Sequence, residues 1–431
     1  MSEKFTVKNV VNINKSTLSN KDNWSKLKYL DTGNITENQI DTLQIFQKGE
    51  KLPSRAKRKV QKGTIIYSTV RPNQKHFGYF DTYSNDLVVS TGFATLDVID
   101  TRVNSKYLYY LLTQNSVISQ LQGIGENSTS SYPSIRPEDI GNLSFMFPDI
   151  EIQNKIADIL TAIDKKIQIN KQINQELEAM AKTLYDYWFV QFDFPDQNGK
   201  PYKSSGGKMV YHPELKREIP EGWGVTTFSS WISDNKTGDW GKETSEGNYK
   251  LAVDCIRGAD INGLSGNGKI DMPTRFILEK NKNKLLTDFD IVIEISGGSP
   301  TQSTGRIVGI SENVLNRFEL PLICSNFCKA VSLNEQETFY NFVYEWKNLY
   351  DNGVLFSWEG KTSGIKNLLF DSFVTNYHIA QPPIDLMKQF FNYASSVDKK
   401  TQLLLKQNQE LTQLRDWLLP MLMNGQVKVE R

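Results

Sequence analysis

The sequence predicts an α+β protein in which two mixed α/β domains are separated by two long antiparallel helices that form a coiled-coil-like pair. Three observations predict this fold. Residues 148–188 carry apolar side chains at helical spacing, with no Pro or Gly after residue 148. A similar stretch recurs at residues 382–421. The segments before the two stretches share strand and loop patterns, so we expect a pseudo-twofold internal repeat.

The first long helix is predicted from apolar residues that lie three or four positions apart. They are Ile152, Ile156, Ile159, Ile163, Ile173, Leu177, Met180, Leu184 and Tyr187. Lys166 and Asn170 occupy two polar positions in this series. About 36 residues, at a rise of 1.5 Å each, would form a rod roughly 50 Å long.

The second copy of this stretch lies 234 positions later. The identical pieces are DKK at 164–166 and 398–400, and NQEL at 174–177 and 408–411. The second apolar series consists of Leu386, Phe390, Tyr393, Val397, Leu404, Leu411, Leu414, Leu418 and Met421. Lys166 and Lys400 interrupt the two series at the same place, so each is expected to fix the helix register or to face a partner subunit, with register favoured.

Residues 1–147 are predicted to form the first domain. Short apolar runs predict strands at 63–68, 86–90 and 140–147. Residues 105–121 have the apolar face of a helix, and the loop GIGENSTSSYP follows at 123–133. The N-terminal boundary of this domain stays open.

The second domain is predicted at residues 224–381, after a linker at 192–223 that is dense in Pro, Gly and Ser. The helical segments cover 148–191 and 382–431. Parts of the two domains match, namely 29–36 with 255–262, 64–67 with 290–293, 89–93 with 323–327, and 134–136 with 364–366. The loops at 68–75 and 296–306 differ in sequence. Matching frameworks with different loops indicate one task performed on two targets.

Composition sets broad limits on the class of protein. A chain of 431 residues suggests two to four domains. No apolar run approaches about 18 residues and three cysteines cannot build a disulfide framework, so we expect a cytoplasmic protein without membrane contact. Residues 1–147 hold 18 Lys and Arg against 13 Asp and Glu, an excess of +5. Part of it lies in RAKRKVQK at 55–62, which is typical of a phosphate-contacting surface or of a solvated loop.

Motifs for catalysis and metal binding are incomplete. GLSGNGK at 263–269 has the spacing of a phosphate-binding loop, but no core strand precedes it and no Ser or Thr follows its Lys. PD at 195–196 and ELK at 214–216 imitate a nuclease metal site, but both lie in the expected linker. QPPI at 381–384 lacks the Asn and the aromatic ring that adenine methyltransferases use. The three cysteines, Cys255, Cys324 and Cys328, lack a fourth zinc ligand and are expected to be buried.

An ordered set of short motifs covers nearly the whole chain. The set consists of FPD at 147–149, the isoleucine series after it, LYDYWF at 184–189, IPEGW at 219–223, RGAD at 257–260 and SGGSP at 296–300. With the internal repeat, it resembles the specificity subunits of type I restriction-modification systems. One departure is that no PEGW precedes the first domain.

The resemblance implies a non-catalytic reader of double-stranded DNA, in which each domain recognises one half of a split, asymmetric site. The long helices would act as a spacer and dock two methyltransferase subunits. S-adenosylmethionine, ATP and Mg²⁺ would be bound by the methyltransferase and restriction subunits, and none of them by this chain. The alternative is a two-domain coiled-coil scaffold for protein–protein interaction.

Candidate DNA contacts are polar residues in loops at strand ends, where side chains can reach base edges and phosphates. For direct base readout we predict Arg71, Asn73, Gln74, Lys75, Gln302 and Arg306. For phosphate contact we predict Ser130, Ser131, Tyr132, Arg136, Lys361, Thr362 and Lys366. His76 is a further candidate because it lies in the first polar loop. No catalytic or metal-binding residue is predicted.

Overall fold

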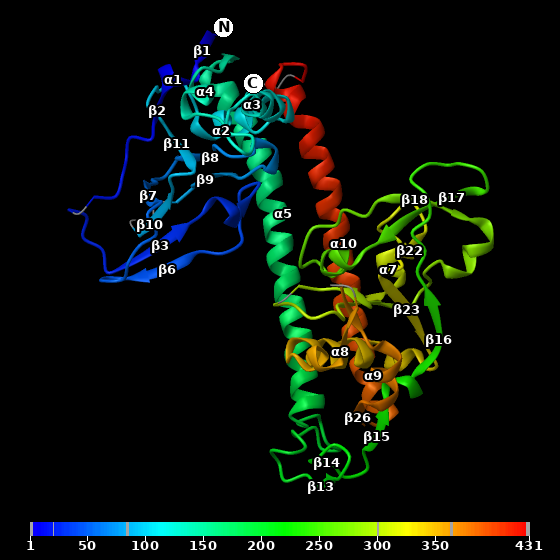
Figure 1. Ribbon diagram of the computed structural model, residues 1–431. Coiled ribbons are helices and arrows are strands. Elements are labelled where there is room, and N and C mark those ends of the chain that lie inside the picture. The colour runs from blue at the N-terminus through cyan, green and yellow to red at the C-terminus, as the bar shows by residue number, and fades with distance from the viewer. Residues whose placement is uncertain (1–2, 20, 83–85, 300, 363–364, 428–431) are drawn as a thin grey trace. The chain divides into compact units, whose positions relative to one another are not determined.

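The computed structural model describes residues 3–19, 21–82, 86–299, 301–362 and 365–427 (Figure 1). None of the helices in these ranges is long and apolar enough to cross a membrane. The chain divides into two compact units, Met1–Lys166 with Leu411–Arg431, and Ile167–Glu410. Each of the long helices, α5 (Ile150–Tyr185) and α10 (Ile384–Met423), contributes one part to each unit. The predicted domain borders stay predictions.

The first unit is built on two sheets. One is antiparallel, in the order β2 (Val11–Ile13), β11 (Phe93–Val98), β8 (Ile65–Ser68), β9 (Phe77–Tyr79). The other has the order β6 (Gln44–Gln47), β3 (Lys26–Leu30), β10 (Leu87–Ser90), β7 (Ala56–Lys59), with β3 and β10 parallel. Every residue of β8 and β10 is buried, which explains their mostly apolar sequences. Shorter pairs are β1 (Glu3–Thr6) with β12 (Ser144–Phe147), and β4 (Ile35–Thr36) with β5 (Gln39–Ile40).

The short helices of the first unit correct two expectations. They are α1 (Val7–Val10), α2 (Ser105–Leu112), α3 (Asn115–Glu126) and α4 (Pro137–Gly141). The single helix predicted over 105–121 is two helices, because Thr113 and Gln114 bond back to carbonyls of α2 and end it. α3 also covers the start of the predicted loop at 123–133. α4 replaces the start of the strand predicted at 140–147, because a proline opens this helix and Asp139 accepts a hydrogen bond from the Arg136 backbone nitrogen at 2.7 Å.

The second unit repeats this strand plan. Its antiparallel sheet has the order β16 (Ile232–Thr237), β23 (Cys328–Leu333), β19 (Asp290–Glu294), β21 (Ile307–Ile310). A second sheet has the order β18 (Thr274–Leu278), β17 (Tyr249–Ile256), β22 (Leu322–Cys324), with β17 and β22 parallel. β15 (Gly224–Thr227) pairs with β26 (His378–Gln381), and β25 (Ile365–Leu368) lies between β20 (Ser296–Gly297) and β24 (Glu359–Thr362). These sheets correspond in order and pairing direction to those of the first unit, except that β7 has no counterpart among the described strands of the second unit.

The structure corrects one of the matched pairs by a single residue. Leu87 pairs with Lys28 in the first unit, and Leu322 pairs with Asp254 in the second. Since Lys28 and Asp254 are 226 positions apart, Leu87 corresponds to Leu322, and the match of 89–93 with 323–327 is offset by one position. In a strand, a one-residue offset exchanges the two faces, so Phe327 does not correspond to the buried Phe93.

Aromatic side chains form the core of the second unit. Its helices are α6 (Ile261–Leu264), α7 (Glu312–Leu315), α8 (Phe339–Asp351) and α9 (Phe370–Asn376). The ring centroids of Trp346 in α8 and Phe373 in α9 are 5.1 Å apart. Phe390 of α10 belongs to the same core cluster, and its ring centroid lies 5.4 Å from that of Tyr185 of α5. The long helices are therefore part of this core.

The segment predicted as a linker, residues 192–223, is packed and ordered. It contains the antiparallel hairpin of β13 (Met209–His212) and β14 (Arg217–Pro220). Phe192 and Trp223 are buried with ring centroids 5.3 Å apart. The Pro and Gly residues predicted turns, but they gave no sign that a few large apolar side chains anchor the segment.

Within each unit, the parts of α5 and α10 are antiparallel, as predicted. In the second unit Asn170 bonds to Asn408 and Asn174 bonds to Thr401, so residue numbers rise along one helix and fall along the other. In the first unit, residues 156–160 of α5 share a core cluster with residues 422–423 of α10.

The buried face of α5 differs from the predicted apolar series. Ile159, Ile173 and Met180 are 37%, 37% and 55% exposed, whereas Asn170 and Asn174 are buried. Leu414 of the second series is exposed as well. Lys166 and Lys400 also lie on exposed positions, so the prediction that they fix the register inside the helix pair is wrong. The buried face therefore shares Ile156 with the predicted series, but it also includes amide side chains that made it less apolar than that series.

Candidate nucleic-acid interface

The first candidate loop follows β8 and covers residues 69–76. Arg71 and Lys75 have left-handed backbone conformations, with φ of 46° and 57°, on either side of a 3-10 turn at Pro72–Gln74. Residues other than glycine adopt this conformation rarely, so surrounding contacts must hold the loop. The backbone nitrogen of Arg71 donates to the Pro133 carbonyl at 2.9 Å. The backbone nitrogen of Asn73 donates to Oε1 of Gln122 at 3.2 Å.

Residues 127–136 lie against this loop, and we call the two segments together the first loop surface. The backbone nitrogen of Ile135 donates to the Thr69 carbonyl at 2.9 Å. The Arg71 guanidinium lies 5.6 Å from the centre of the Tyr132 ring, within cation–π range. Ser130 donates its hydroxyl hydrogen to the Tyr132 carbonyl at 2.5 Å. A predicted base-reading residue thus lies beside two predicted phosphate contacts.

Exposure separates the candidates on the first loop surface. The exposed ones are Arg71, Asn73, Gln74, Ser130, Ser131, Tyr132 and Arg136. Lys75 forms an ion pair in which its Nζ lies 2.7 Å from Oε1 of Glu37. The half-buried His76 lies with Nδ1 2.5 Å from the Ile35 carbonyl, to which this nitrogen can donate. Lys75 and His76 therefore fasten the loop to residues 35–37.

The second candidate loop follows β19 and is described at residues 295–299 and 301–306. It begins as β20, which pairs with β25. In the first unit, Val70 and Ser134 form an isolated antiparallel bridge at the corresponding place. Gln302 is exposed, and its backbone exchanges hydrogen bonds of 3.0 and 3.2 Å with Ser299. Both loops are therefore held by a pairing with the segment that leads to the last strand of the unit.

Arg306 does not lie at an exposed loop tip, contrary to what direct base readout requires. Its side chain is 17% exposed and forms a double ion pair with Glu294, with Nε 2.9 Å from Oε2 and Nη2 2.5 Å from Oε1. The hydrogen bonds that Arg306 donates to the Glu294 carboxylate raise the pKa of Arg306 further above its usual value. Glu294 ends β19 and Arg306 directly precedes β21, so the pairing of these strands brings the two side chains together.

Lys366 is also engaged within its own unit. Its Nζ lies 3.0 Å from Oε2 of Glu359 and 4.9 Å from the centre of the Phe356 ring. Lys361 and Thr362 belong to β24, but their side chains lie outside the described residues. The predicted phosphate contacts of the second unit therefore cluster on the β24–β25 pair.

Two exposed aromatic rings beside the second loop were not predicted from the sequence. Phe327 is 53% exposed, and its carbonyl accepts hydrogen bonds from the backbone nitrogens of Ile295 and Ser296 at 2.9 and 3.1 Å. Phe356, under Lys366, is 44% exposed. Such rings can stack on bases or contact thymine methyl groups. The internal repeat was the one signal in the sequence that could have pointed to Phe327. The corresponding residue of the first unit is Gly92, whose carbonyl accepts a hydrogen bond from the Thr69 backbone nitrogen.

The basic segment at 55–62 is largely the edge strand β7. Lys59 forms an ion pair with Asp22. Arg58 is half-buried, and burial lowers the pKa of its guanidinium. Arg55, Lys57 and Lys62 remain exposed and could contact phosphate. Strand alternation explains why only part of the segment faces solvent.

The three cysteines are buried and unpaired. Burial raises the pKa of Cys255 and of Cys328 to about 12, which disfavours the thiolate needed for nucleophilic or metal chemistry. In the described ranges, no three His, Cys, Asp or Glu side chains are grouped so that they could hold a metal ion.

Comparison with known proteins identifies relatives. A family model for the type I restriction modification DNA specificity domain matches residues 2–179, which include the first loop surface. The type I restriction enzyme HindI specificity subunit of Haemophilus influenzae is 34% identical over 187 residues, which are 43% of this chain and 40% of that subunit. The MjaIX specificity subunit of Methanocaldococcus jannaschii is 27% identical over 370 residues, which are 86% of this chain and 78% of the relative.

A solved structure shares the fold. The crystal structure of the type I restriction-modification system S subunit from M. genitalium covers 98% of this chain and 96% of its own, with a TM-score of 0.54 at 17% identity. This likeness agrees with the predicted arrangement of mixed domains and long helices. The chain thus resembles type I restriction-modification specificity subunits, in sequence over residues 2–179 and over parts of the two named relatives, and in fold.

Proposed function

We propose that this chain is the non-catalytic DNA-specificity subunit of a type I restriction-modification complex, and that each globular domain reads one half of a bipartite site. The observation that carries the proposal is the pair of corresponding sheet frameworks with dissimilar loops at the same strand ends. Because the frameworks correspond, the two domains would meet DNA in similar ways. Because the loops differ, they would read different bases.

The chemistry of the first loop surface supports this proposal. Arg71, Asn73 and Gln74 are exposed side chains of the types that hydrogen-bond to guanine and adenine edges. Tyr132 and Arg136 are exposed on the adjoining segment and could contact the sugar-phosphate backbone. In the second domain, Gln302, Phe327 and the β24–β25 pair would provide the corresponding surface.

The long helices would set the distance between the half-sites. With 36 residues α5 extends about 54 Å, and with 40 residues α10 extends about 60 Å, at a rise of 1.5 Å per residue. Half-sites read from one face of the duplex are separated by about one turn, roughly 34 Å, or somewhat more. The helices are therefore long enough to hold two readers at such a separation.

Exposed apolar residues on the helices support docking of two methyltransferase subunits. In the second unit, Ile169, Ile173 and Met180 of α5 are exposed at spacings of four and seven residues, so they share a helix face. In the first unit, Leu414 and Trp417 of α10 are exposed three positions apart. Exposed apolar patches of this kind mark protein–protein contact sites. The docked subunits would bind S-adenosylmethionine and methylate adenine, and a restriction subunit would use ATP and Mg²⁺.

Salt-dependent retention on DNA tests the proposal. The chain, assembled with its methyltransferase partner, should bind a bipartite duplex, and affinity should fall steeply as salt rises. The bound sequence can be found by sequencing the methylated genome of a host that carries the chain. Partner assembly without sequence-dependent or salt-dependent DNA binding would instead support a coiled-coil scaffold.

Exchange of residues 224–380 for the same segment of another specificity subunit provides a second test. Only one half of the methylated sequence should change, because the first domain and both helices are kept. A change in both halves would contradict the assignment of one half-site to each domain.

A further inference from the structure

The repeated sequence DKK, at residues 164–166 and 398–400, is not used by the proposed function. In both copies the two lysines are exposed, whereas the aspartate is half-buried. A helix presents consecutive residues about 100° apart, so the aspartate can face the protein while the lysines face solvent. Asp164 and Asp398 therefore each have contacts within their own unit.

Asp164 of α5 links three elements of the first unit. Its Oδ2 accepts a hydrogen bond from the Tyr110 hydroxyl of α2 at 2.7 Å. Its Oδ1 accepts one from Nη1 of Arg415 of α10 at 3.1 Å. Burial and the nearby Asp164 carboxylate raise the pKa of Tyr110, which therefore remains a hydrogen-bond donor. One carboxylate thus ties a helix of the first domain to both long helices.

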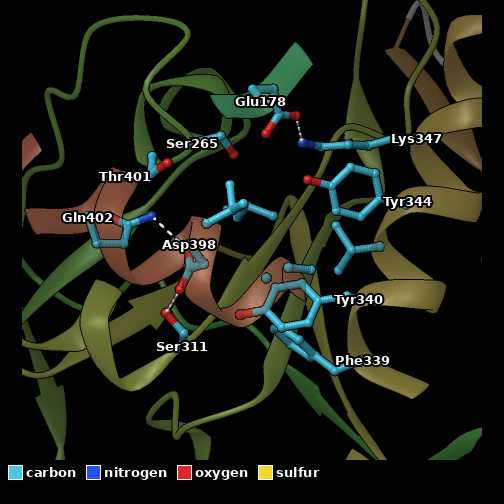
Figure 2. A pocket seen from close by; sticks show the side chains of 15 residues that line it. Glu178, Ser265, Ser311, Phe339, Tyr340, Tyr344, Lys347, Asp398, Thr401 and Gln402 are labelled. Atoms are coloured by element: carbon cyan, nitrogen blue, oxygen red, sulfur yellow. Dashed lines mark hydrogen bonds and ion pairs between the residues drawn. The ribbon is translucent and has the colours of Figure 1, made fainter. Parts of the chain in front are cut away.

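Asp398 of α10 makes the corresponding link in the second unit (Figure 2). Its Oδ2 accepts a hydrogen bond from the Ser311 hydroxyl at 2.6 Å, and its Oδ1 accepts one from Nε2 of Gln402 at 3.2 Å. Ser311 is the N-cap of α7 and also accepts from the backbone nitrogen of Val314. Gln402 accepts a hydrogen bond from Nη1 of the half-buried Arg317 at 2.6 Å. The carboxylate thus ties the start of a domain helix to α10.

The surroundings of the two aspartates also differ. Asp398 borders a cavity of about 60 Å³, whose opposite wall includes Tyr344 and the 2.8 Å ion pair of Lys347 with Glu178 (Figure 2). Tyr344 follows Tyr110 by 234 positions, the same interval that relates the aspartates. Within the described residues no lysine or arginine forms an ion pair with Asp398, whereas Asp164 has Arg415. The second link therefore depends on neutral hydroxyl and amide donors.

We infer that Asp164 and Asp398 are equivalent positioning residues, each of which locks one recognition domain onto the long helices so that its loops meet DNA at a fixed place. This inference rests on the proposed function. Adjacent base pairs are about 3.4 Å apart along the duplex. A domain that could shift on its helices by a similar distance would accept half-sites displaced by one base pair. Each carboxylate link opposes such a shift in its own unit.

The test uses the assembled methyltransferase complex and four variants. Asp164→Ala and Asp398→Ala remove the two links, and Asp158→Ala and Asp385→Ala are matched controls, because these aspartates are exposed on the same two helices. Methyl transfer is measured on sites with the preferred spacer and with one base pair more or less. It is also measured on sites with a single mismatch in either half.

Each positioning variant should lower spacer discrimination about tenfold, the effect of losing a charged hydrogen bond worth about 1.5 kcal/mol. Mismatch discrimination should fall only in the half that the same domain reads, so Asp164→Ala and Asp398→Ala should affect opposite halves. The inference would be overturned if a positioning variant lost mismatch discrimination equally in both half-sites, or if it discriminated as well as its control variant. A general loss of stability would lower the amount of complex but would not affect one half-site more than the other, so it would also count against the inference.

A second measurement keeps the inference testable if an alanine variant fails to assemble or if the wild-type complex shows no bipartite site. Hydrogen exchange of the full chain should rise at the start of α7 in Asp398→Asn and at α2 in Asp164→Asn, with no effect in the other unit. Unchanged exchange at both places would contradict the links themselves. Normal exchange effects with no wild-type preference for bipartite DNA would contradict the proposed function instead.

Discussion

The buried contact between Asn170 of α5 and Asn408 of α10 predicts that the effects of replacing the two residues are coupled. Asn170 has no exposed surface, and its Nδ2 donates to Oδ1 of Asn408 and to Oε1 of Gln407, both at 2.8 Å. Nδ2 of Asn408 donates in turn to the Ile167 carbonyl at 3.3 Å. Oδ1 of Asn170 is buried without a hydrogen-bond partner among the described residues.

The expected energies follow from these contacts. Asn170→Leu removes two neutral hydrogen bonds, worth about 1 kcal/mol each, and takes the Asn170 donor away from Asn408, at a further cost of about 1–3 kcal/mol. Apolar burial and removal of the unpartnered Oδ1 offset part of this, so we expect a net loss of about 1–3 kcal/mol. Asn170→Leu with Asn408→Leu removes both the donor and the acceptor. The double variant should therefore be at least as stable as Asn170→Leu, with a coupling energy of about 1–3 kcal/mol.

Hydrogen exchange of the helix amides measures these energies locally. Opening free energies for α5 and α10 near residues 167–175 and 401–408, in wild type, both single variants and the double variant, complete a double-mutant cycle. Lys166→Ala on the exposed face of α5 is the control and should leave the opening energies unchanged. If the losses in the two single variants simply add in the double variant, Asn170 and Asn408 are not coupled and the reasoning is refuted.

Three further predictions concern the core, the DNA surface and pH. Phe390→Ala should lower the unfolding free energy by about 3–5 kcal/mol in urea denaturation followed by fluorescence, because Phe390 is fully buried against Tyr185; a loss below about 1 kcal/mol would contradict this packing. Arg71→Ala should weaken DNA binding and, if the side chain contacts phosphate, reduce the salt slope by about 1, with Lys166→Ala as a charge-matched control. Burial raises the pKa of Asp398, so the folded chain retains a proton that the unfolded chain releases above about pH 4. The melting temperature should therefore fall as the pH rises from about 4 towards the pKa of Asp398 in the folded chain. Asp398→Asn should remove the share of this fall that Asp398 causes. If the variant shows the same dependence of melting temperature on pH as the wild type, another group causes the fall.

The strand framework was the most predictable part of the fold. β8 and β19 are fully buried in the centres of their sheets, so their sequences are mostly apolar and stand out between polar loops. The boundaries around α2, α3 and α4 were less predictable. They depend on single side chains, such as Gln114 bonding to the Leu111 carbonyl, which end or start a helix without changing the hydrophobic pattern.

The positions of the candidate loops could be predicted from the sequence. Which of their side chains are exposed to a DNA ligand could be predicted less well. Arg71 and Gln74 are exposed at the end of β8, as their polar loop suggested. Arg306 and Lys366 are engaged by Glu294 and Glu359, which reach them through strand pairing and lie elsewhere in the sequence. A sequence pattern identifies a charged residue in a loop, but it does not show which opposite charge the fold brings beside it.

The misassigned face of α5 has a physical cause in the way buried amides align the helix pair. A helix face made only of leucine and isoleucine can pack in several registers at similar energy, whereas buried amides satisfy their hydrogen bonds in few of them. Asn170 and Asn174 therefore favour a single alignment of α5 with α10, at some cost in apolar burial. Of the apolar series, Ile156 stays buried in a core cluster, whereas Ile173 and Met180 remain on the outer face. The strongest hydrophobic period in α5 is therefore divided between core and surface, and the buried amides mark the contact with α10 in the second unit.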